Sequence, residues 1–252
     1  MYPVIFIGHG TPMNAIEQNE FTENWQKIAL SISKPKIILS ISAHWVTKGT
    51  QIMGNEDPKT IYDFYGFPQE LYQVQYPAKG DEEFANRVRD LLGDSLVSTS
   101  WGLDHGTWSV LKVMYPDADL KVLQISLDHF KTPSEHYEIG KKLQSLRNEA
   151  LIMGSGNIVH NLRLASFTVL DGFEWAGPFD RFIRENIINR NHDNIINYQN
   201  IPNYKLAIPT TEHFDPLLYV IGASTNDDEV EVYNDKCIYG SLSMTSYVFK
   251  NE

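Results

Sequence analysis

Residues 4–10 read VIFIGHG, a short apolar run that ends in a histidine between two glycines. Continuous apolarity over about four to eight residues is typical of a β-strand that is buried on both faces of a sheet. Three further runs have this character, at residues 37–41, 122–125 and 151–153. Together, the four runs predict the centre of a parallel sheet.

Helical patterns separate these runs, and several of them carry cap signals. Residues 132–135 read Thr-Pro-Ser-Glu, which is a capping box with proline in the first helical position. Asp81 is placed to cap a second helix, and Asp215 is expected to cap a short one that has Pro216 in its first position. The expected helices cover residues 21–32, 84–92, 132–146 and 180–189, with the short one after Asp215.

Strands that alternate with helices indicate βαβ units, in which helices cover both faces of the sheet. Residues 230–249 are richer in strand signals, and we expect one or two strands there to join the same sheet, where an antiparallel pairing is open to them. The fold prediction is α/β, with a mostly parallel or mixed central sheet and helices on both faces. No linker-like stretch divides the 252 residues, so we expect a single domain over residues 1–252.

The charge and composition argue against several classes of partner. The net charge of −11, from 21 basic and 32 acidic residues, repels phosphate backbones, so we expect no nucleic acid and no membrane surface as partner. No apolar stretch reaches the roughly 18 residues of a membrane span, and the first residues lack the basic region of a signal peptide. A cytoplasmic location is therefore expected. The single cysteine excludes an intrachain disulfide and a multi-thiolate metal site, so any metal here depends on nitrogen and oxygen ligands.

Five histidines each follow a short apolar or small-residue run. If those runs are strands of one parallel sheet, their carboxyl ends meet at one edge, where open α/β sheets place their ligands. Convergent neutral imidazoles are common ligands of Zn, Fe, Cu and Ni. A metal site is therefore the leading hypothesis, built from His9, His44, His105, His160 and His213.

A single histidine near a strand end is more often a hydrogen-bonded structural residue than a ligand. We take His129, His136 and His192 in this structural sense, because His136 falls on the apolar stripe of a helix and His192 lies in a polar run. The chain has no HExxH and no CxxC motif. Spacing alone thus predicts a metal site and leaves its reaction open.

Six motifs run in order from residue 8 to residue 223: GHGTPMNAI, ISAHW, IYDFYGFP, LDHGTWSVL, GSGNIVHNLR and EHFDPLLYVIGA. This ordered set resembles the class III extradiol ring-cleaving dioxygenases, and among them the DOPA 4,5-dioxygenase-like branch. The resemblance covers nearly the whole chain.

The resemblance implies a role for each matched histidine. His9, His44 and His213 correspond to the metal ligands of that branch. His160 corresponds to the acid/base histidine beside the metal, and His105 to a second active-site histidine.

The resemblance also places Asp63 and Tyr65, on the DFYGFP loop, near the substrate. Aromatic residues of this region form either a wall around a planar substrate or part of the core. They are Trp45, Tyr62, Phe64, Tyr65 and Phe67.

The implied reaction opens the ring of a catechol, such as L-DOPA, with O2 at an Fe(II) centre to give a semialdehyde. Zn2+ is an alternative metal, because imidazoles bind it more tightly than Fe2+, and His160 would then be a fourth ligand. Two other functions stay open: a zinc-dependent hydrolase on the same site, and a non-catalytic binding protein with the dioxygenase fold. A carboxylate beside the metal would favour the hydrolase. Glu212 is the nearest in sequence, and its place in a turn predicts that it points away. The oligomeric state is not determined by the sequence.

Overall fold

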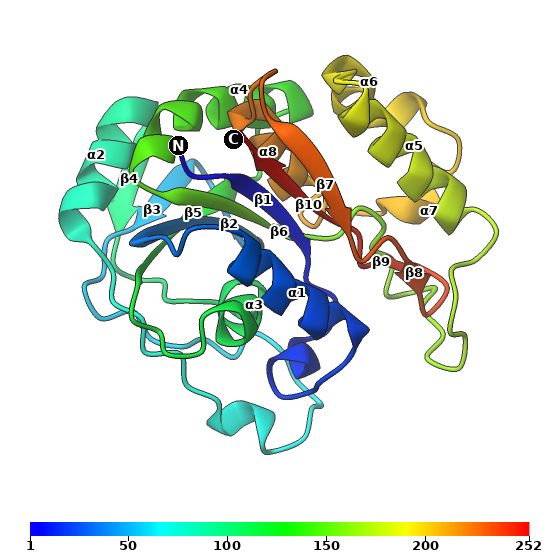
Figure 1. Cartoon of the computed structure of the whole chain (residues 1–252), viewed down its shortest axis with the longest axis horizontal. Coiled ribbons are helices and arrows are strands. Elements are labelled where there is room, and N and C mark those ends of the chain that lie inside the picture. The colour runs from blue at the N-terminus through cyan, green and yellow to red at the C-terminus, as the bar shows by residue number, and fades with distance from the viewer. Residues whose placement is uncertain (252) are drawn as a thin grey trace.

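An eight-stranded sheet forms the centre of the computed structural model, which describes residues 1–251 (Figure 1). The strand order is β4-β3-β5-β2-β6-β1-β10-β7. Its four inner strands pair in parallel and contain the four apolar runs, which confirms the predicted sheet centre. They are β1 (Val4–Gly8), β2 (Ile37–Thr47), β5 (Lys121–Asp128) and β6 (Leu151–Gly156).

The outer strands make the sheet mixed. β10 (Ser246–Lys250) pairs antiparallel with both β1 and β7 (Glu229–Tyr233), so the strands expected in residues 230–249 join the sheet. At the other edge, β3 (Thr50–Met53) is antiparallel to β5 and parallel to β4 (Ser95–Ser98). A separate small ladder joins β8 (Cys237–Ile238) and β9 (Leu242–Ser243).

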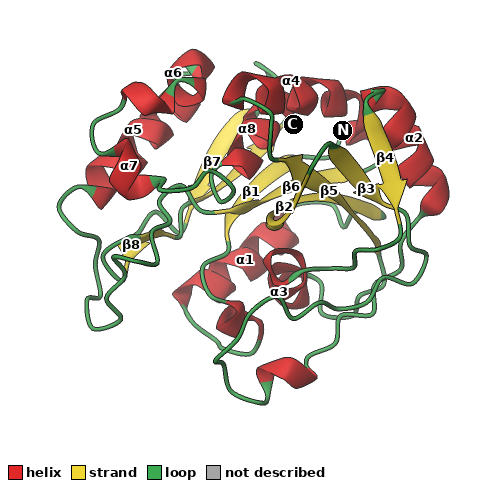
Figure 2. Ribbon diagram, turned by 180° about the vertical axis from the view of Figure 1, so that it is seen from behind, coloured by secondary structure: helices red, strands yellow, loops and turns green. Residues whose placement is uncertain are grey.

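Helices cover both faces of the sheet, as expected for this fold class (Figure 2). Alternate residues of β1 serve the two faces: Ile5 and Ile7 belong to one buried cluster, and Val4 and Phe6 belong to the other. The first cluster includes residues of α1 (Glu20–Ser31) and α3 (His105–Met114). The second includes residues of α2 (Glu82–Leu92), α4 (Pro133–Leu143) and α8 (Asp215–Ala223).

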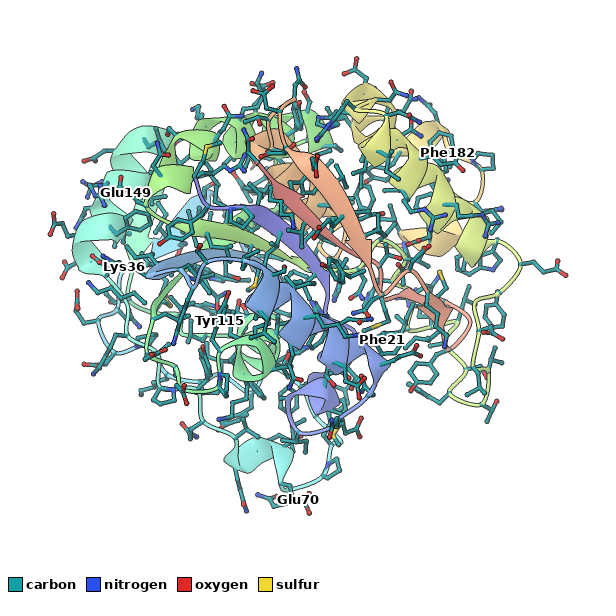
Figure 3. The ribbon with its side chains drawn as sticks, viewed as in Figure 1. Phe21, Lys36, Glu70, Tyr115, Glu149 and Phe182 are labelled. Carbon is teal, nitrogen blue, oxygen red and sulfur yellow. The ribbon has the colours of Figure 1, made fainter. Side chains whose placement is uncertain are left out.

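A second group of helices packs beside the outer antiparallel strands, to the right of the sheet in Figure 1. It comprises α5 (Ala176–Ile188), α6 (His192–Ile196) and α7 (Tyr204–Ala207). Short 3-10 helices complete the chain: η1 (Pro12–Ala15), η2 (Leu71–Gln73), η3 (Gln144–Asn148) and η4 (Tyr198–Asn200). Figure 3 shows side chains filling the space between the layers, with Glu70 at the far end of the loop that carries η2. Within residues 1–251, no helix combines the length and the apolar character that crossing a membrane requires.

The predicted helix starts are confirmed at two positions and corrected at a third. Asp81 caps α2, and Thr132 forms a capping box with Glu135 at the start of α4. At α8, however, Asp215 is the first helical residue and Phe214 occupies the cap position. The Asp215 carboxylate accepts a hydrogen bond from the Thr211 hydroxyl and caps no backbone N–H of α8.

Two of the five runs before the histidines are not strands of the sheet, which corrects the sequence interpretation. The run before His105 begins at Ser98, the last residue of β4, and beyond it makes only an isolated bridge, between Leu103 and Thr60, because Asp104 caps a helix immediately afterwards. The run before His213 begins inside α7 and continues through Pro209, which has no N–H to donate to a ladder. Both residues nevertheless join the other histidines, His105 as the first residue of a helix and His213 from a loop.

Candidate metal centre

Five imidazoles gather at the carboxyl ends of the inner strands. His9 follows β1, and His44 lies in β2 where its pairing with β5 is interrupted between Ile41 and Val46. Such irregularities re-aim a side chain out of its regular alternation. The ring centres of His9 and His44 are 5.1 Å apart. His105, the first residue of α3, lies 3.9 Å from His44, and His213 lies 5.0 Å from His44. The His160 ring stacks on His213 at 3.4 Å.

Backbone hydrogen bonds around the exit of β6 hold three of these segments together. The His9 N–H donates to the Gly156 carbonyl at 3.1 Å, and the Asn157 N–H donates to the His213 carbonyl at 2.8 Å. Three residues later, the His160 N–H donates to Ala207 at 2.9 Å. Gly156 permits this approach, since a Cβ there would lie 2.1 Å from the His213 carbonyl oxygen. The glycine at the end of β6 is therefore needed for the cluster to close.

Replacing Gly156 by alanine is expected to lower the free energy of unfolding by at least about 2 kcal/mol, because the added methyl group meets backbone that cannot rotate away. Thermal unfolding of the metal-free protein measures the loss. Gly177→Ala is the matched control, because this residue lies in α5 and its added Cβ meets only the far end of the Arg181 side chain. An alanine at position 156 that is as stable as the control would contradict the close packing described here.

A hydrogen bond fixes the proton of the His9 ring. The Ser155 hydroxyl donates its single hydrogen to the Gly106 carbonyl, which can only accept. The contact of 3.0 Å between His9 Nδ1 and the Ser155 oxygen therefore requires the proton on Nδ1. Consequently Nε2 of neutral His9 carries a lone pair.

One carboxylate fixes two more rings. The Asp63 carboxylate lies 3.3 Å from Nδ1 of His44 and 2.9 Å from Nδ1 of His105. A carboxylate is an acceptor, so the hydrogen bond places a proton on Nδ1 of His105. At Nδ1 of His44 the same carboxylate lies at ion-pair distance and favours a proton there as well. Burial by itself raises the pKa of Asp63, but the hydrogen bonds and charge of His105 and the nearby His44 outweigh it, and this pKa lies below its usual value.

Glu212 does not point away from the site, which corrects the sequence expectation. Its carboxylate lies 3.2 Å from Nδ1 of the adjacent His213 and also accepts a hydrogen bond from the Thr210 hydroxyl at 2.8 Å. It forms a group with His160 and His213 whose ligand atoms all lie within 4.8 Å of one another. Within residues 1–251, His160 is the one member of the five whose ring makes no hydrogen bond.

Four imidazoles of the site, those of His9, His44, His160 and His213, are neutral at pH 7. Burial, and then the neighbouring rings, lower the pKa of His9 well below its ordinary value, and the same causes act on His213. Burial is also the largest cause at His44, whose pKa is lowered to about 3 although Asp63 opposes the shift. Burial lowers the pKa of His160 to about 4. Neutral imidazole is the form that binds metals.

The donor set fits a metal ion. Nε2 of His9 and Nε2 of His44 lie 3.2 Å apart. The Ser155 hydroxyl holds the proton of His9 on Nδ1, and the Asp63 carboxylate favours the same position for the proton of His44, so both Nε2 atoms can serve as ligands. Two metal–nitrogen bonds of about 2.0–2.1 Å that meet at roughly 90–110° place their nitrogens about 2.9–3.4 Å apart. His9 and His44 are thus spaced as two ligands of one ion, and His105 lies in the same group of possible ligands.

A buried network beneath the cluster was missed by sequence reasoning. The Asp104 carboxylate is fully buried and accepts hydrogen bonds from the Ser42 hydroxyl at 2.6 Å and the Gln124 amide at 2.6 Å. It thereby connects β2 and β5 to the start of α3. Ser42 is two residues from His44 in the sequence, and Asp104 is next to His105. Asp104 also caps α3, but its partners Ser42 and Gln124 are 62 and 20 residues away, so no local pattern singled it out.

The aromatic candidates separate into distinct environments. Trp45 is buried and stacks on Trp101 with ring centres 5.7 Å apart. Phe64 approaches the edge of His105 at 5.4 Å, which brings one ring of the DFYGFP loop to the cluster. The Tyr65 side chain is 92% exposed, and a contact between it and a substrate stays a prediction.

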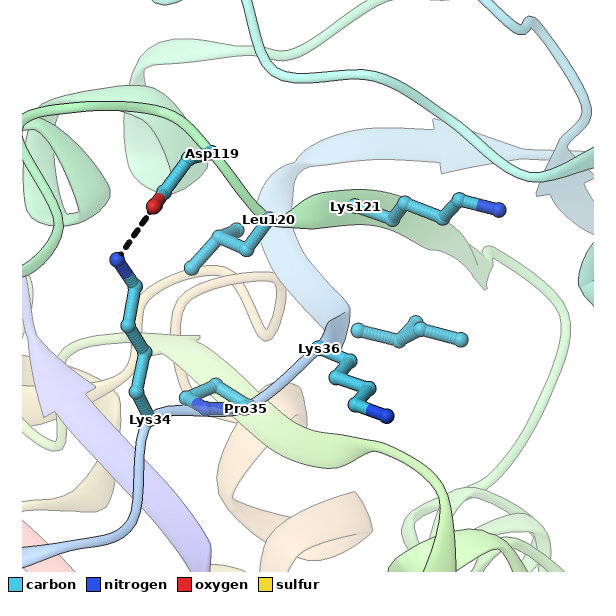
Figure 4. Close-up of a pocket in the computed structure, with 7 residues that line it drawn as sticks. Lys34, Pro35, Lys36, Asp119, Leu120 and Lys121 are labelled. Carbon is cyan, nitrogen blue, oxygen red and sulfur yellow. Dashed lines mark hydrogen bonds and ion pairs between the residues drawn. The ribbon is translucent and has the colours of Figure 1, made fainter.

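A pocket at the amino ends of the strands, on the side of the sheet opposite to the histidines, is separate from the cluster. It has a volume of about 500 Å³ and lies at the amino ends of β2 and β5 (Figure 4). Lys34, Lys36 and Lys121 line it, and Lys34 is paired with Asp119 at 2.6 Å. Ligands of open α/β sheets bind at the carboxyl ends of the strands, so the histidine cluster is the candidate centre.

Comparisons with known proteins agree with the geometry. Residues 3–250 match the family described as catalytic LigB subunit of aromatic ring-opening dioxygenase. A protein from Escherichia coli K12 named 4,5-DOPA dioxygenase extradiol is 40% identical over 97% of this chain and 93% of its own length. One of the same name from Beta vulgaris is also 40% identical, over 97% and 95%. The crystal structure of an uncharacterized Escherichia coli K12 protein has a TM-score of 0.87 and 35% identity, and the match covers 99% of this chain and 100% of that one.

An α/β fold with neutral imidazoles at the carboxyl ends of its parallel strands defines a candidate metal-dependent enzyme. The chain belongs to the family of catalytic LigB subunits of aromatic ring-opening dioxygenases. It is therefore an oxidoreductase of the extradiol ring-cleaving class, which uses O2 and a small-molecule substrate. The resemblance carried by the six sequence motifs is confirmed.

Proposed function

We propose that this protein is an Fe(II)-dependent extradiol dioxygenase that cleaves the ring of a catechol such as L-DOPA to give a semialdehyde. The observation that carries the proposal is the cluster of imidazoles at the carboxyl ends of the inner strands, in which Nε2 of His9 and Nε2 of His44 lie 3.2 Å apart. The name shared by the relatives from Escherichia coli and Beta vulgaris supports a catechol of the DOPA type as substrate.

His9, His44 and His213 hold the metal in this proposal. The spacing of His9 and His44 supports this set. The ring centre of His213 lies 5.4 Å from that of His9 and 5.0 Å from that of His44. Three neutral ligands leave the full charge of the ion on the site and leave positions open. When bound, Fe(II) would act as a Lewis acid that favours the ionised catechol and as a redox centre for the reduction of O2.

His160 is the proposed acid/base. Its ring lies against His213, and within residues 1–251 no hydrogen bond occupies either of its nitrogens. A free nitrogen beside the ligand set can take the proton of a catechol hydroxyl and return it to the product later.

His105 is the proposed acceptor for a substrate hydroxyl. Its Nδ1 donates a hydrogen bond to Asp63, so the neutral ring has its lone pair on Nε2. His105 belongs to the same group of possible ligands as His9 and His44. The edge of Phe64 packs beside this ring and gives a planar substrate an apolar neighbour.

A zinc-dependent hydrolase is the second candidate, and the place of Glu212 favours it. A carboxylate grouped with His160 and His213 is the kind of base that such an enzyme uses. However, that carboxylate already has two hydrogen-bond partners, Nδ1 of His213 and the Thr210 hydroxyl. The full-length match to ring-opening dioxygenases ranks the hydrolase second.

Anaerobic reconstitution tests the proposal. The metal-free protein is loaded with Fe(II) and mixed with L-DOPA or simple catechols, while O2 uptake and visible absorbance are recorded. We expect one O2 consumed for each catechol and a yellow semialdehyde, with no uptake by the Zn2+-loaded control. Iron-loaded protein that consumes no O2 with any catechol would reject the iron proposal, and metal-dependent ester hydrolysis by the zinc form would then favour the hydrolase.

A further inference from the structure

The Asp63 carboxylate lies between two histidines that come from different elements. One oxygen, Oδ2, is 2.9 Å from Nδ1 of His105 and 3.3 Å from Nδ1 of His44. The other oxygen, Oδ1, accepts a hydrogen bond of 2.9 Å from the backbone N–H of His105 at the start of α3. The Asp63 side chain is only 15% exposed. Its two oxygens accept hydrogen bonds from the backbone and the ring of His105, and its charge lies at ion-pair distance from His44.

The loop that carries Asp63 is fixed to α3 by other contacts. The Ile61 N–H donates to the Leu103 carbonyl at 2.7 Å, and the Trp108 indole N–H donates to the Ile61 carbonyl at 2.8 Å. The rings of Tyr62 and Phe64, on either side of Asp63, both pack against Trp108. The backbone of the loop is thus held in place without the carboxylate.

Only an acceptor at both oxygens satisfies this arrangement. Each contacting ring then keeps its proton on Nδ1 and presents the Nε2 lone pair on its opposite side. An amide at the same position has one oxygen and one NH2 group, so it cannot accept at both positions from His105, and it places no negative charge beside His44. At least one ring would have to turn, or to move its proton to Nε2, where it would point into the cluster.

We infer that Asp63 is a positioning residue that acts through two rings at once: it fixes His44 as a metal ligand and His105 as an acceptor for the substrate hydroxyl. The inference rests on the proposed function for the identity of the metal and the substrate. The hydrogen bonds themselves do not depend on it. Carboxylates that hold ligating histidines in this way change metal affinity or activity by about 10–100-fold when they are removed.

Imidazole NMR of the unaltered protein is the first test. Long-range proton–nitrogen correlation spectra of the Zn2+-loaded protein, assigned through His44 and His105 variants, should show both rings with the proton on Nδ1. A proton on Nε2 of either ring would overturn the inference. This measurement needs no Asp63 variant and therefore does not depend on whether one folds.

Metal affinity of Asp63→Asn is the second test, with Asp57→Asn as the matched control. Asp57 is 76% exposed, and its one ion pair within residues 1–251 is with Lys79. In a chelator competition with Zn2+, Asp63→Asn should bind about 10–100-fold more weakly than the unaltered protein, and the control should bind equally well. Unaltered affinity together with unchanged ring protons in Asp63→Asn would overturn the inference.

The two tests separate this inference from the proposed function. If the iron-loaded protein opens no catechol while the Asp63 variant shows weakened Zn2+ binding and a displaced ring proton, the reaction is wrong and the role of Asp63 toward the metal stands. If the protein opens catechols and the variant keeps affinity and ring protons, the reaction stands and the role of Asp63 is rejected.

Discussion

Replacing His9 by alanine is expected to abolish stoichiometric metal binding. The change removes one of two Nε2 nitrogens that lie 3.2 Å apart, which is the spacing of two ligands of one ion. Loss of a direct ligand should exceed the loss from an outer partner, so the affinity for Fe(II) or Zn2+ should fall by more than about 100-fold. Metal analysis after dialysis against a limiting concentration of chelator measures it.

His129→Ala is the matched control, because His129 follows β5 but is exposed and lies outside the cluster. It should retain metal. The same loss is expected for His44→Ala and His213→Ala. A variant of any of the three that keeps one metal per chain would remove that residue from the ligand set.

His160→Phe is expected to keep the metal and to lose turnover. The phenyl ring preserves the stack on His213, whose planes are within 7° of each other, so the cluster should keep its shape. It carries no nitrogen that can accept a proton. General acid–base catalysis contributes about 10²–10⁴-fold, and kcat should fall by that factor with metal content unchanged.

Parallel measurement of metal content and O2 uptake separates two roles of His160. Loss of turnover with full iron content assigns it as acid/base. Loss of metal itself would make His160 a ligand, as in the tetrahedral zinc form considered from the sequence. Ring opening at the normal rate in the variant would reject both roles.

Patterns that depend on neighbouring residues could be predicted from the sequence. The four continuous apolar runs correspond to β1, β2, β5 and β6, since burial on both faces requires such runs wherever the chain enters the sheet. The caps of α2 and α4 were predictable because the cap and the N–H it satisfies are three residues apart. Asp215 was predicted as the cap of α8, but it is the first helical residue, so the helix begins one residue earlier than predicted. The cap was misplaced because Asp and Pro are both favoured in the first turn as well.

The histidine cluster was partly predictable. His9 and His44 accompany β1 and β2, whose direction and burial the sequence reveals, so their convergence follows from a parallel sheet. His105 and His213 join the cluster from a helix start and a loop, and the reason first given for their convergence was wrong. The six motifs singled them out without showing how they arrive.

The sequence by itself determined the α/β class, the inner strands, the starts of α2 and α4, and the group of histidines. Only the tertiary structure decided which nitrogen of each ring faces the centre, because the partners that decide it are distant in the chain: Ser155 lies 146 residues from His9, and Asp63 lies 42 residues from His105. It also turned Glu212 toward His213 and buried Trp45 against Trp101. Local periodicity encodes burial and capping, whereas hydrogen bonds between distant segments exist only once the chain has brought those segments together.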